Sequence, residues 1–227
     1  MYEEIRTVIE VASAIMCFIL LWFMIKPYKI TGENRYLGLP LGFGFLAATY
    51  VISAFSFYSP QIFGTNTIYF QLIARTFALI FIANTYFFSK KHTQNSQKHW
   101  QIALITLIIG LIILLLIVNI PDITLPSYVI TRNFSRVLNL IIILYICIHT
   151  FRSHIKKPDK TPIWLPLGYI ILLVSQYSLL LFQLDNSLSA FFAGLILRLI
   201  FLSVFLNISF LTFYRVEKRP EDEEDGT

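Results

Sequence analysis

The sequence predicts an all-α integral membrane protein, a single bundle of seven transmembrane helices. Of its 227 residues, 56% are hydrophobic and only 14% are charged, whereas about 25% of residues are charged in a typical soluble domain. The mean hydropathy of +0.69 agrees with this composition. Apolar runs long enough to cross a membrane recur along the whole chain. These observations exclude a soluble globular fold, and we expect no separate soluble domain.

Seven apolar runs are each long enough to cross a hydrocarbon core about 30 Å thick at about 1.5 Å per helical residue. Their predicted bounds are 5–28, 38–58, 67–88, 100–120, 127–151, 162–184 and 188–214. The first run is too long for a signal-peptide core and follows an acidic start, so we expect Met1 to be retained. Residues 1–216 are predicted to form one transmembrane domain, and 217–227 a disordered acidic cytoplasmic tail.

The positions of Lys and Arg predict the orientation in the membrane. Basic residues gather after spans one, three, five and seven, among them Lys29, Arg35, Lys90, Lys91, Lys157, Lys160, Arg215 and Lys218. The connections 59–66, 121–126 and 185–187 contain no Lys or Arg. Because basic loops stay in the cytoplasm, we expect an external N-terminus and a cytoplasmic C-terminus in the cell membrane. The net charge of +5 thus reflects topology and contact with membrane lipid, and we expect no nucleic-acid partner.

Parts of the chain are repeated. The tetrapeptide Leu-Pro-Leu-Gly stands at 39–42 and again at 165–168. Two polar residues recur 123 residues later, Arg75 as Arg198 and Asn84 as Asn207. The repeats predict two parallel three-helix units, about 5–91 and 127–215, joined by a linker helix at 100–120 that restores their orientation.

This three-plus-one-plus-three layout resembles the PQ-loop and SWEET sugar transporters, the microbial rhodopsins, and uncharacterised seven-helix proteins of archaea. The resemblance to SWEET proteins implies a sugar site lined by Asn84 and Asn207, although the family's PQ dipeptides are missing from the matching helices. The resemblance to rhodopsins implies a Schiff-base lysine in span seven. Residues 188–214 contain no lysine, so we exclude a retinal pigment.

Four arginines fall well within the predicted spans, Arg75, Arg132, Arg136 and Arg198, and the spans hold a single acid, Glu10. An arginine at the centre of a membrane helix costs about 2.5–3.5 kcal/mol, so those well inside must face protein, water or a ligand. The surplus of guanidinium groups favours a small anionic or carbonyl-bearing ligand, which forked donors hold well.

Helical spacing gathers these residues into polar faces. Arg136 shares a face of span five with Arg132 and Asn139, Gln71 shares one with Arg75, and Gln176 shares one with Tyr169 and Gln183. The predicted ligand-binding residues are therefore Glu10, Gln71, Arg75, Arg136, Gln176 and Arg198. Nine residues at about 100° each place Asn84 opposite Arg75, so we predict interhelical hydrogen bonds for Asn84 and Asn207 instead.

The arginines also have a structural interpretation that the sequence leaves open. Arg132 is close enough to the interface to extend toward water. The other three would tie helices together through Glu10, tyrosines and backbone carbonyls. Glu10 has a further candidate partner in Arg6, four residues earlier on the same helix face.

Signals for catalysis are weak. The four histidines form no metal-binding motif, the spans hold no pair of carboxylates, and no Gly-x-Ser-x-Gly, P-loop or Rossmann signature occurs. We expect no enzyme, no cofactor and no metal. Cys17 and Cys147 are predicted to be core residues without a disulfide.

The sequence favours a receptor-like or sensory membrane protein that binds a small anionic ligand in the outer half of the bundle and faces a cytoplasmic or membrane protein partner. One alternative is a small-solute transporter of PQ-loop or SWEET-like architecture, which the parallel repeat supports. Another is a non-catalytic subunit of a larger membrane complex, whose arginines meet acids on other chains.

Overall fold

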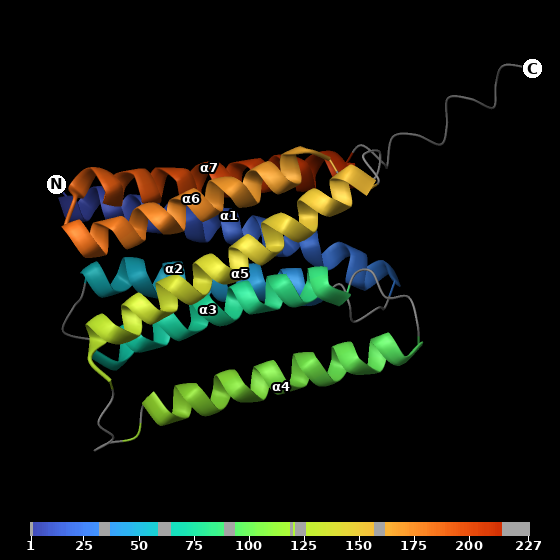
Figure 1. Ribbon diagram of the computed structural model, residues 1–227, viewed down its shortest axis with the longest axis horizontal. Helices are drawn as coiled ribbons and strands as arrows, with labels where there is room; N and C mark the ends of the chain where they lie inside the picture. Colours follow the sequence, from blue (N-terminus) through green and yellow to red (C-terminus); the bar gives the residue numbers. More distant parts are fainter. Residues whose placement is uncertain are drawn as a thin grey trace, which may run out of the picture.

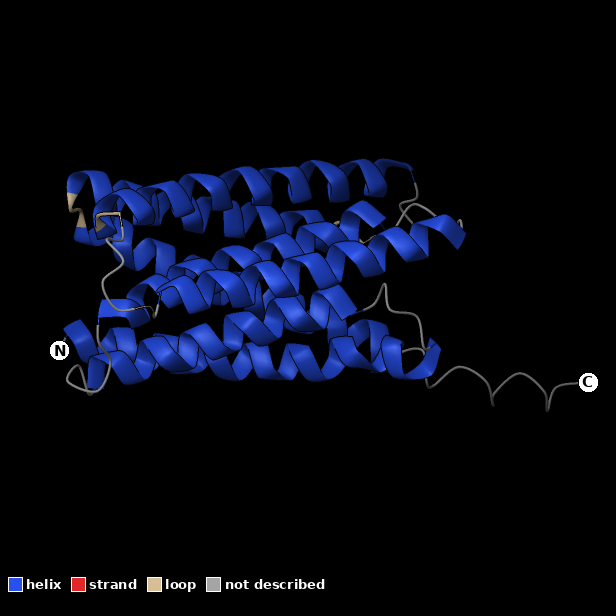
Figure 2. Cartoon of the chain, turned by 90° about the horizontal axis from the view of Figure 1, so that it is seen from below, coloured by secondary structure: helices blue, strands red, loops and turns tan. Residues whose placement is uncertain are grey.

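The computed structural model describes residues 2–31, 37–58, 65–88, 94–118, 120, 126–156 and 162–214. Within these segments the chain is helical apart from short connections (Figure 2). The helices are α1 (Tyr2–Thr31), α2 (Gly38–Tyr58), α3 (Thr65–Phe88), α4 (Gln94–Val118), α5 (Tyr128–Lys156), α6 (Trp164–Asp185) and α7 (Leu188–Tyr214). All seven are long and apolar enough to cross a membrane, which confirms the predicted all-α architecture. The predicted tail at 217–227 lies outside the described residues.

The helices extend beyond the apolar runs that predicted them. Helix α4 begins at Gln94, before the predicted start at 100, and α5 continues to Lys156, past the predicted end at 151. The predicted bounds followed hydrophobicity, but a helix continues as long as its backbone hydrogen bonds do. The basic residues His154 and Lys156 in the last turn of α5 also interact favourably with the helix dipole.

Six helices form a closed ring, and α4 lies outside it. Around the ring, α1 packs on α2, α2 on α3, α3 on α5, α5 on α6, α6 on α7, and α7 on α1. Helix α4 packs mainly on α3, at the edge of the bundle (Figure 1). The main hydrophobic core draws buried residues from all six ring helices and none from α4. It includes Cys17 and Cys147, which are both free, as predicted.

Glycines allow the closest helix approaches in the ring. A Cβ atom on Gly42 of α2 would lie 2.5 Å from Cγ1 of Ile82 on α3. One on Gly194 of α7 would lie 2.7 Å from Cγ of Leu179 on α6. Small residues at such positions let membrane helices pack with their backbones close together.

The turn between α6 and α7 is short because of Asn186. This residue adopts the left-handed conformation (φ 52°), and its N–H donates to the carbonyl of Phe182 at 2.9 Å. Asn is one of the few residues that tolerates this conformation at a helix end. Helix α7 therefore starts directly after α6 and runs back along it.

Candidate functional site

A buried ion cluster joins α1, α3 and α7. Glu10 on α1 and Arg198 on α7 are each only 2% exposed. Nη1 of Arg198 donates to Oε1 of Glu10 at 3.3 Å, and its Nη2 lies 3.3 Å from Oε2. Nη2 of Arg75 on α3 lies 3.7 Å from the same Oε2. The two contacts to Oε2 are ion pairs without hydrogen-bond geometry. One carboxylate thus holds two arginines from different helices.

Helix α2 contributes an aromatic ring to the same cluster. The guanidinium carbon of Arg198 lies 4.4 Å from the centroid of the Tyr50 ring, and that of Arg75 lies 5.1 Å from it. Both distances fall within the range of cation–π attraction, which is stronger when the groups are desolvated. Arg75 also donates from Nε to the Thr49 hydroxyl at 3.4 Å. Tyr50 therefore offsets part of the repulsion between the two cations.

Arg136 on α5 has no acidic partner among the described residues. Its Nη1 donates to Oε1 of Gln176 on α6 at 2.7 Å, and its Nε is buried without a hydrogen-bond acceptor. The charged side chains that act on it are those of Arg75 and Arg198, both cationic. A neutral amide is thus the only side-chain acceptor that the described part of the chain offers this guanidinium.

These side chains surround an internal cavity with room for about 30 Å³ of water-sized occupants. A single water needs about 10–15 Å³ by this measure, so the cavity holds only a very small ligand. Its lining combines three arginines and two amides with apolar walls: Arg75, Arg136, Arg198, Asn139, Gln176, Tyr50, Leu46, Leu79, Leu172, Leu179 and Phe201. Three guanidinium groups face one adjacent carboxylate, which leaves a surplus of two positive charges among the described residues.

The cluster lies in the half of the bundle nearer the start of α1. Glu10 and Arg136 are each eight residues after the first residue of their helices, and Arg75 and Arg198 are each ten residues after theirs. At about 1.5 Å per residue these positions are about 12–15 Å from that end. On the other side of the cavity lies a layer of buried aromatic rings.

The aromatic layer consists of Phe43, Tyr169, Phe201 and Phe205. Each is at most 1% exposed. The ring of Phe205 lies 4.7 Å from that of Phe201, 4.8 Å from that of Tyr169 and 5.9 Å from that of Phe43, measured between centroids. These rings pack closely against one another between the cavity and the opposite end of the bundle.

The structure brings together five of the six predicted ligand-binding residues. Arg75, Arg136, Arg198 and Gln176 line the cavity, and Glu10 contacts two of these arginines. Gln71 does not line it: its amide Nε2 lies 3.5 Å from the Ser56 hydroxyl. Tyr50 was missed, because a tyrosine in an apolar helix gives no signal by itself.

Two other arginines, Arg6 and Arg132, do not line the cavity. Arg132 stacks over the Tyr128 ring at 5.2 Å, near the start of α5. The guanidinium of Arg6 lies 5.4 Å from the Phe191 ring, while Glu10 pairs with the arginines of α3 and α7.

The prediction that Asn84 and Asn207 hydrogen-bond between helices is wrong for the described residues. The Nδ2 atom of Asn84 is buried without an acceptor, in a groove between α3, α4 and α5. Asn207 is exposed on the outer surface of α7. The two asparagines therefore form no common pocket, and neither reaches the arginine cavity.

The cluster is suited to binding and not to acid–base chemistry. Guanidinium groups stay protonated in proteins and present up to five donors each in a fixed planar arrangement. That arrangement matches carboxylates and other oxoanions. No protein-family model, no curated protein and no solved structure matches this chain.

Proposed function

We propose that this protein is a receptor-like or sensory membrane protein that binds a small anion in the cavity between Arg75, Arg136 and Arg198. The surplus of two positive charges around an internal cavity carries this proposal. A buried charge without a partner is costly, and a bound anion removes that cost. Among the described residues, all three guanidinium groups also keep buried nitrogen atoms without a hydrogen-bond acceptor: Arg75 Nη2, Arg136 Nε, and Arg198 Nε and Nη2.

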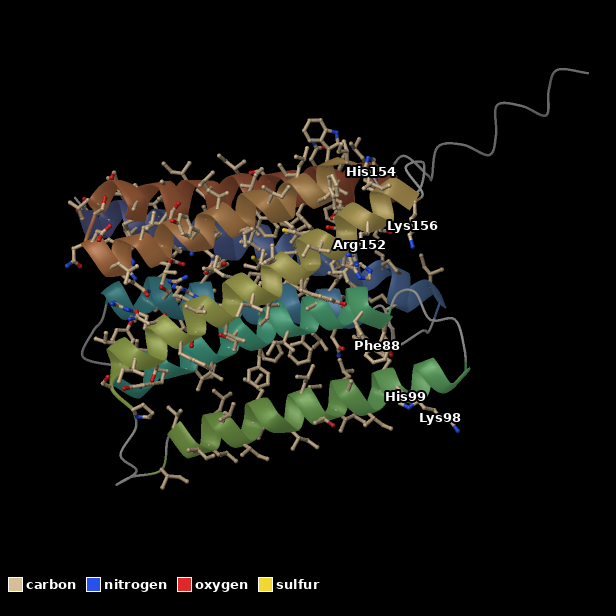
Figure 3. All side chains as sticks on the ribbon, in the orientation of Figure 1. Phe88, Lys98, His99, Arg152, His154 and Lys156 are labelled. Carbon is tan, nitrogen blue, oxygen red and sulfur yellow. The ribbon has the colours of Figure 1, made fainter. Side chains whose placement is uncertain are left out.

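We further propose that the N-terminus is external and that the cavity lies in the outer half of the cell membrane. Figure 3 supports this orientation, since Lys98, Arg152, His154 and Lys156 all lie at one end of the bundle. That end is also where α7 finishes, opposite the start of α1 (Figure 1). Basic residues concentrate on the cytoplasmic side of membrane proteins. The same basic end is where a cytoplasmic partner would bind.

Two parallel units related by duplication form the third part of the proposal. Helix packing supports it. Gly42 of α2 packs on Ile82 of α3, and Gly168 of α6 packs on Phe205 of α7, at matching positions of the two units. The ring contacts match as well, because the first helix of each unit packs on the last helix of the other unit: α1 packs on α7, and α5 packs on α3.

Native mass spectrometry of the gently solubilised protein tests the binding function. The wild type is compared with Arg75→Gln and Arg198→Gln, and Arg132→Gln serves as a control with the same charge change outside the cavity. We expect a small bound mass in the wild type and in the control, and none in the two cavity variants. Stoichiometric protein partners with no small ligand would contradict the receptor-like function and favour a subunit of a larger complex.

A small-solute transporter is the second candidate, because the cavity lies between the two proposed units, where transporters of this plan bind their substrates. The aromatic layer beneath the cavity favours a receptor over this alternative. Proteoliposomes separate them: a transporter moves the anion across the bilayer, whereas a receptor binds it without flux. The complex-subunit alternative has less support, since Arg198 is 2% exposed and out of reach of an acid on another chain.

A further inference from the structure

The two proposed units place different residues at equivalent positions of the cavity. Helices α5 and α6 begin 126 residues after α1 and α2, and α7 begins 123 residues after α3. At these offsets Arg75 corresponds to Arg198, Tyr50 to Gln176, and Leu46 to Leu172, and all six side chains line the cavity. Glu10, however, corresponds to Arg136. The first unit has a carboxylate where the second has a cation.

This difference falls on two matching helix interfaces. Across α1 and α7, Glu10 and Arg198 form an ion pair at 3.3 Å. Across the equivalent interface of α5 and α3, the corresponding residues are Arg136 and Arg75, two cations. Arg75 reaches Glu10 only through one contact of 3.7 Å, and Arg136 has no ion pair among the described residues. The second interface therefore lacks the carboxylate that the first interface has.

We infer that a free, singly charged anion of carboxylate type, no larger than about three or four heavy atoms, binds between Arg75 and Arg136 and takes the place of the missing carboxylate. This inference rests on the proposed anion-binding function and names its ligand class. Formate and nitrate are representatives: each offers two oxygen atoms in a plane to a guanidinium fork.

The size and walls of the cavity set the limit on the ligand. About 30 Å³ accommodates two or three water-sized groups, which is the size of one carboxylate. Apolar side chains, among them Leu79, Leu172 and Phe201, line the remaining walls and offer nothing to a second charged group. Sulfate, a dianion, and citrate, a trianion at neutral pH, are excluded by size and by desolvation, and a long-chain fatty acid is excluded by the lack of room for its tail.

Thermal unfolding of the full-length protein in detergent micelles tests the inference. The background salt is sodium gluconate, whose anion is too large for the cavity, and sodium formate is titrated at constant ionic strength. A ligand at about 100 times its Kd should raise the wild-type unfolding midpoint by about 5–11 °C. Sulfate, citrate and laurate should leave it unchanged. A response to chloride with none to formate would contradict recognition by forked donors.

Two variants exploit the correspondence between the units. Arg136→Glu supplies the missing carboxylate from the chain, so its midpoint should exceed that of the neutral control Arg136→Gln, and neither should respond to formate. Glu10→Ala removes the carboxylate and leaves its space open at the equivalent position in the first unit, so its midpoint should rise with the logarithm of formate concentration about twice as steeply as that of the wild type. The Glu10→Ala variant still tests the inference if Arg136→Glu fails to fold.

The outcomes separate the inference from the function on which it rests. A response to citrate or laurate, but not to formate, would overturn the small free anion and keep an anion site in the protein. A formate response that persists in Arg136→Gln would overturn the position of the site. No response to any anion, in the wild type or in Glu10→Ala, would overturn both proposals.

Discussion

Replacing Glu10 by Gln should destabilise this protein more than any other single loss of charge in the cluster. Glu10 is 2% exposed and pairs with Arg75 at 3.7 Å and Arg198 at 3.3 Å. The substitution keeps the shape of the side chain but leaves both guanidinium groups buried without a counter-ion. Removing one partner of a buried ion pair costs about 3–5 kcal/mol. At about 2–4 °C per kcal/mol for a chain of this length, the unfolding midpoint should fall by about 10 °C.

The assay is thermal unfolding of the purified protein in micelles with gluconate as the only anion, so that no small anion replaces the lost carboxylate. Glu4→Gln, an exposed position on the same helix, is the control and should change the midpoint by about 2 °C or less. The double variant Glu10→Gln with Arg198→Gln should unfold at a higher temperature than Glu10→Gln alone, because the second change removes one unpaired cation. If Glu10→Gln unfolds within 1 °C of the wild type, roughly the resolution of such an assay, the ion cluster does not hold α1, α3 and α7 together.

Three further predictions concern packing and topology. Gly42→Ala should destabilise the protein by about 1–3 kcal/mol, because its Cβ would lie 2.5 Å from Ile82, whereas the control Gly44→Ala, whose Cβ would have its nearest neighbour at 3.8 Å, should be neutral. Equal unfolding midpoints for the two variants would contradict the close approach of α2 to α3. Cys17 and Cys147 are buried, so a maleimide should label the folded protein only after denaturation, and rapid labelling of the native protein would show that the core is open. On that unlabelled background, a membrane-impermeant maleimide added to intact cells should label Ser189→Cys but not Arg152→Cys, and the reverse pattern would invert the proposed orientation.

The fold was predictable because a membrane imposes simple requirements. A helix must satisfy its own backbone and present apolar side chains over about 20 residues, so the seven runs identify the seven helices directly. The polar ends were not predictable from hydrophobicity, and α4 and α5 accordingly begin or end several residues away from the predicted limits. The position of α4 outside the ring follows from packing, which the apolar runs do not encode.

The site was predictable in part. An arginine within a membrane span is costly unless it faces protein, water or a ligand, so these arginines were expected to point into the bundle. Helical spacing also placed Arg136 and Gln176 on polar faces of their helices, and these faces meet in the cavity. Tyr50 was missed because its role depends on the neighbours it packs against; only its register, 126 residues before Gln176, marks it in the sequence.

The asparagine prediction failed for a related reason. Spacing correctly placed Asn84 away from Arg75, but it does not show which helix lies opposite. Asn84 faces the groove beside α4, where its Nδ2 atom finds no acceptor among the described residues. Asn207, 123 residues later, is exposed on α7. Sequence gives the rotation of a residue about its own helix, and the neighbours come from the assembled bundle.

Equilibrium binding of isotopically labelled formate to the purified protein tests the central claim most directly. We expect one saturable formate per chain in the wild type and in Arg132→Gln, and no saturable binding in Arg75→Gln or Arg136→Gln. Binding that survives in both cavity variants, or its absence from wild-type protein that is shown to be folded, would contradict an anion site between these two arginines.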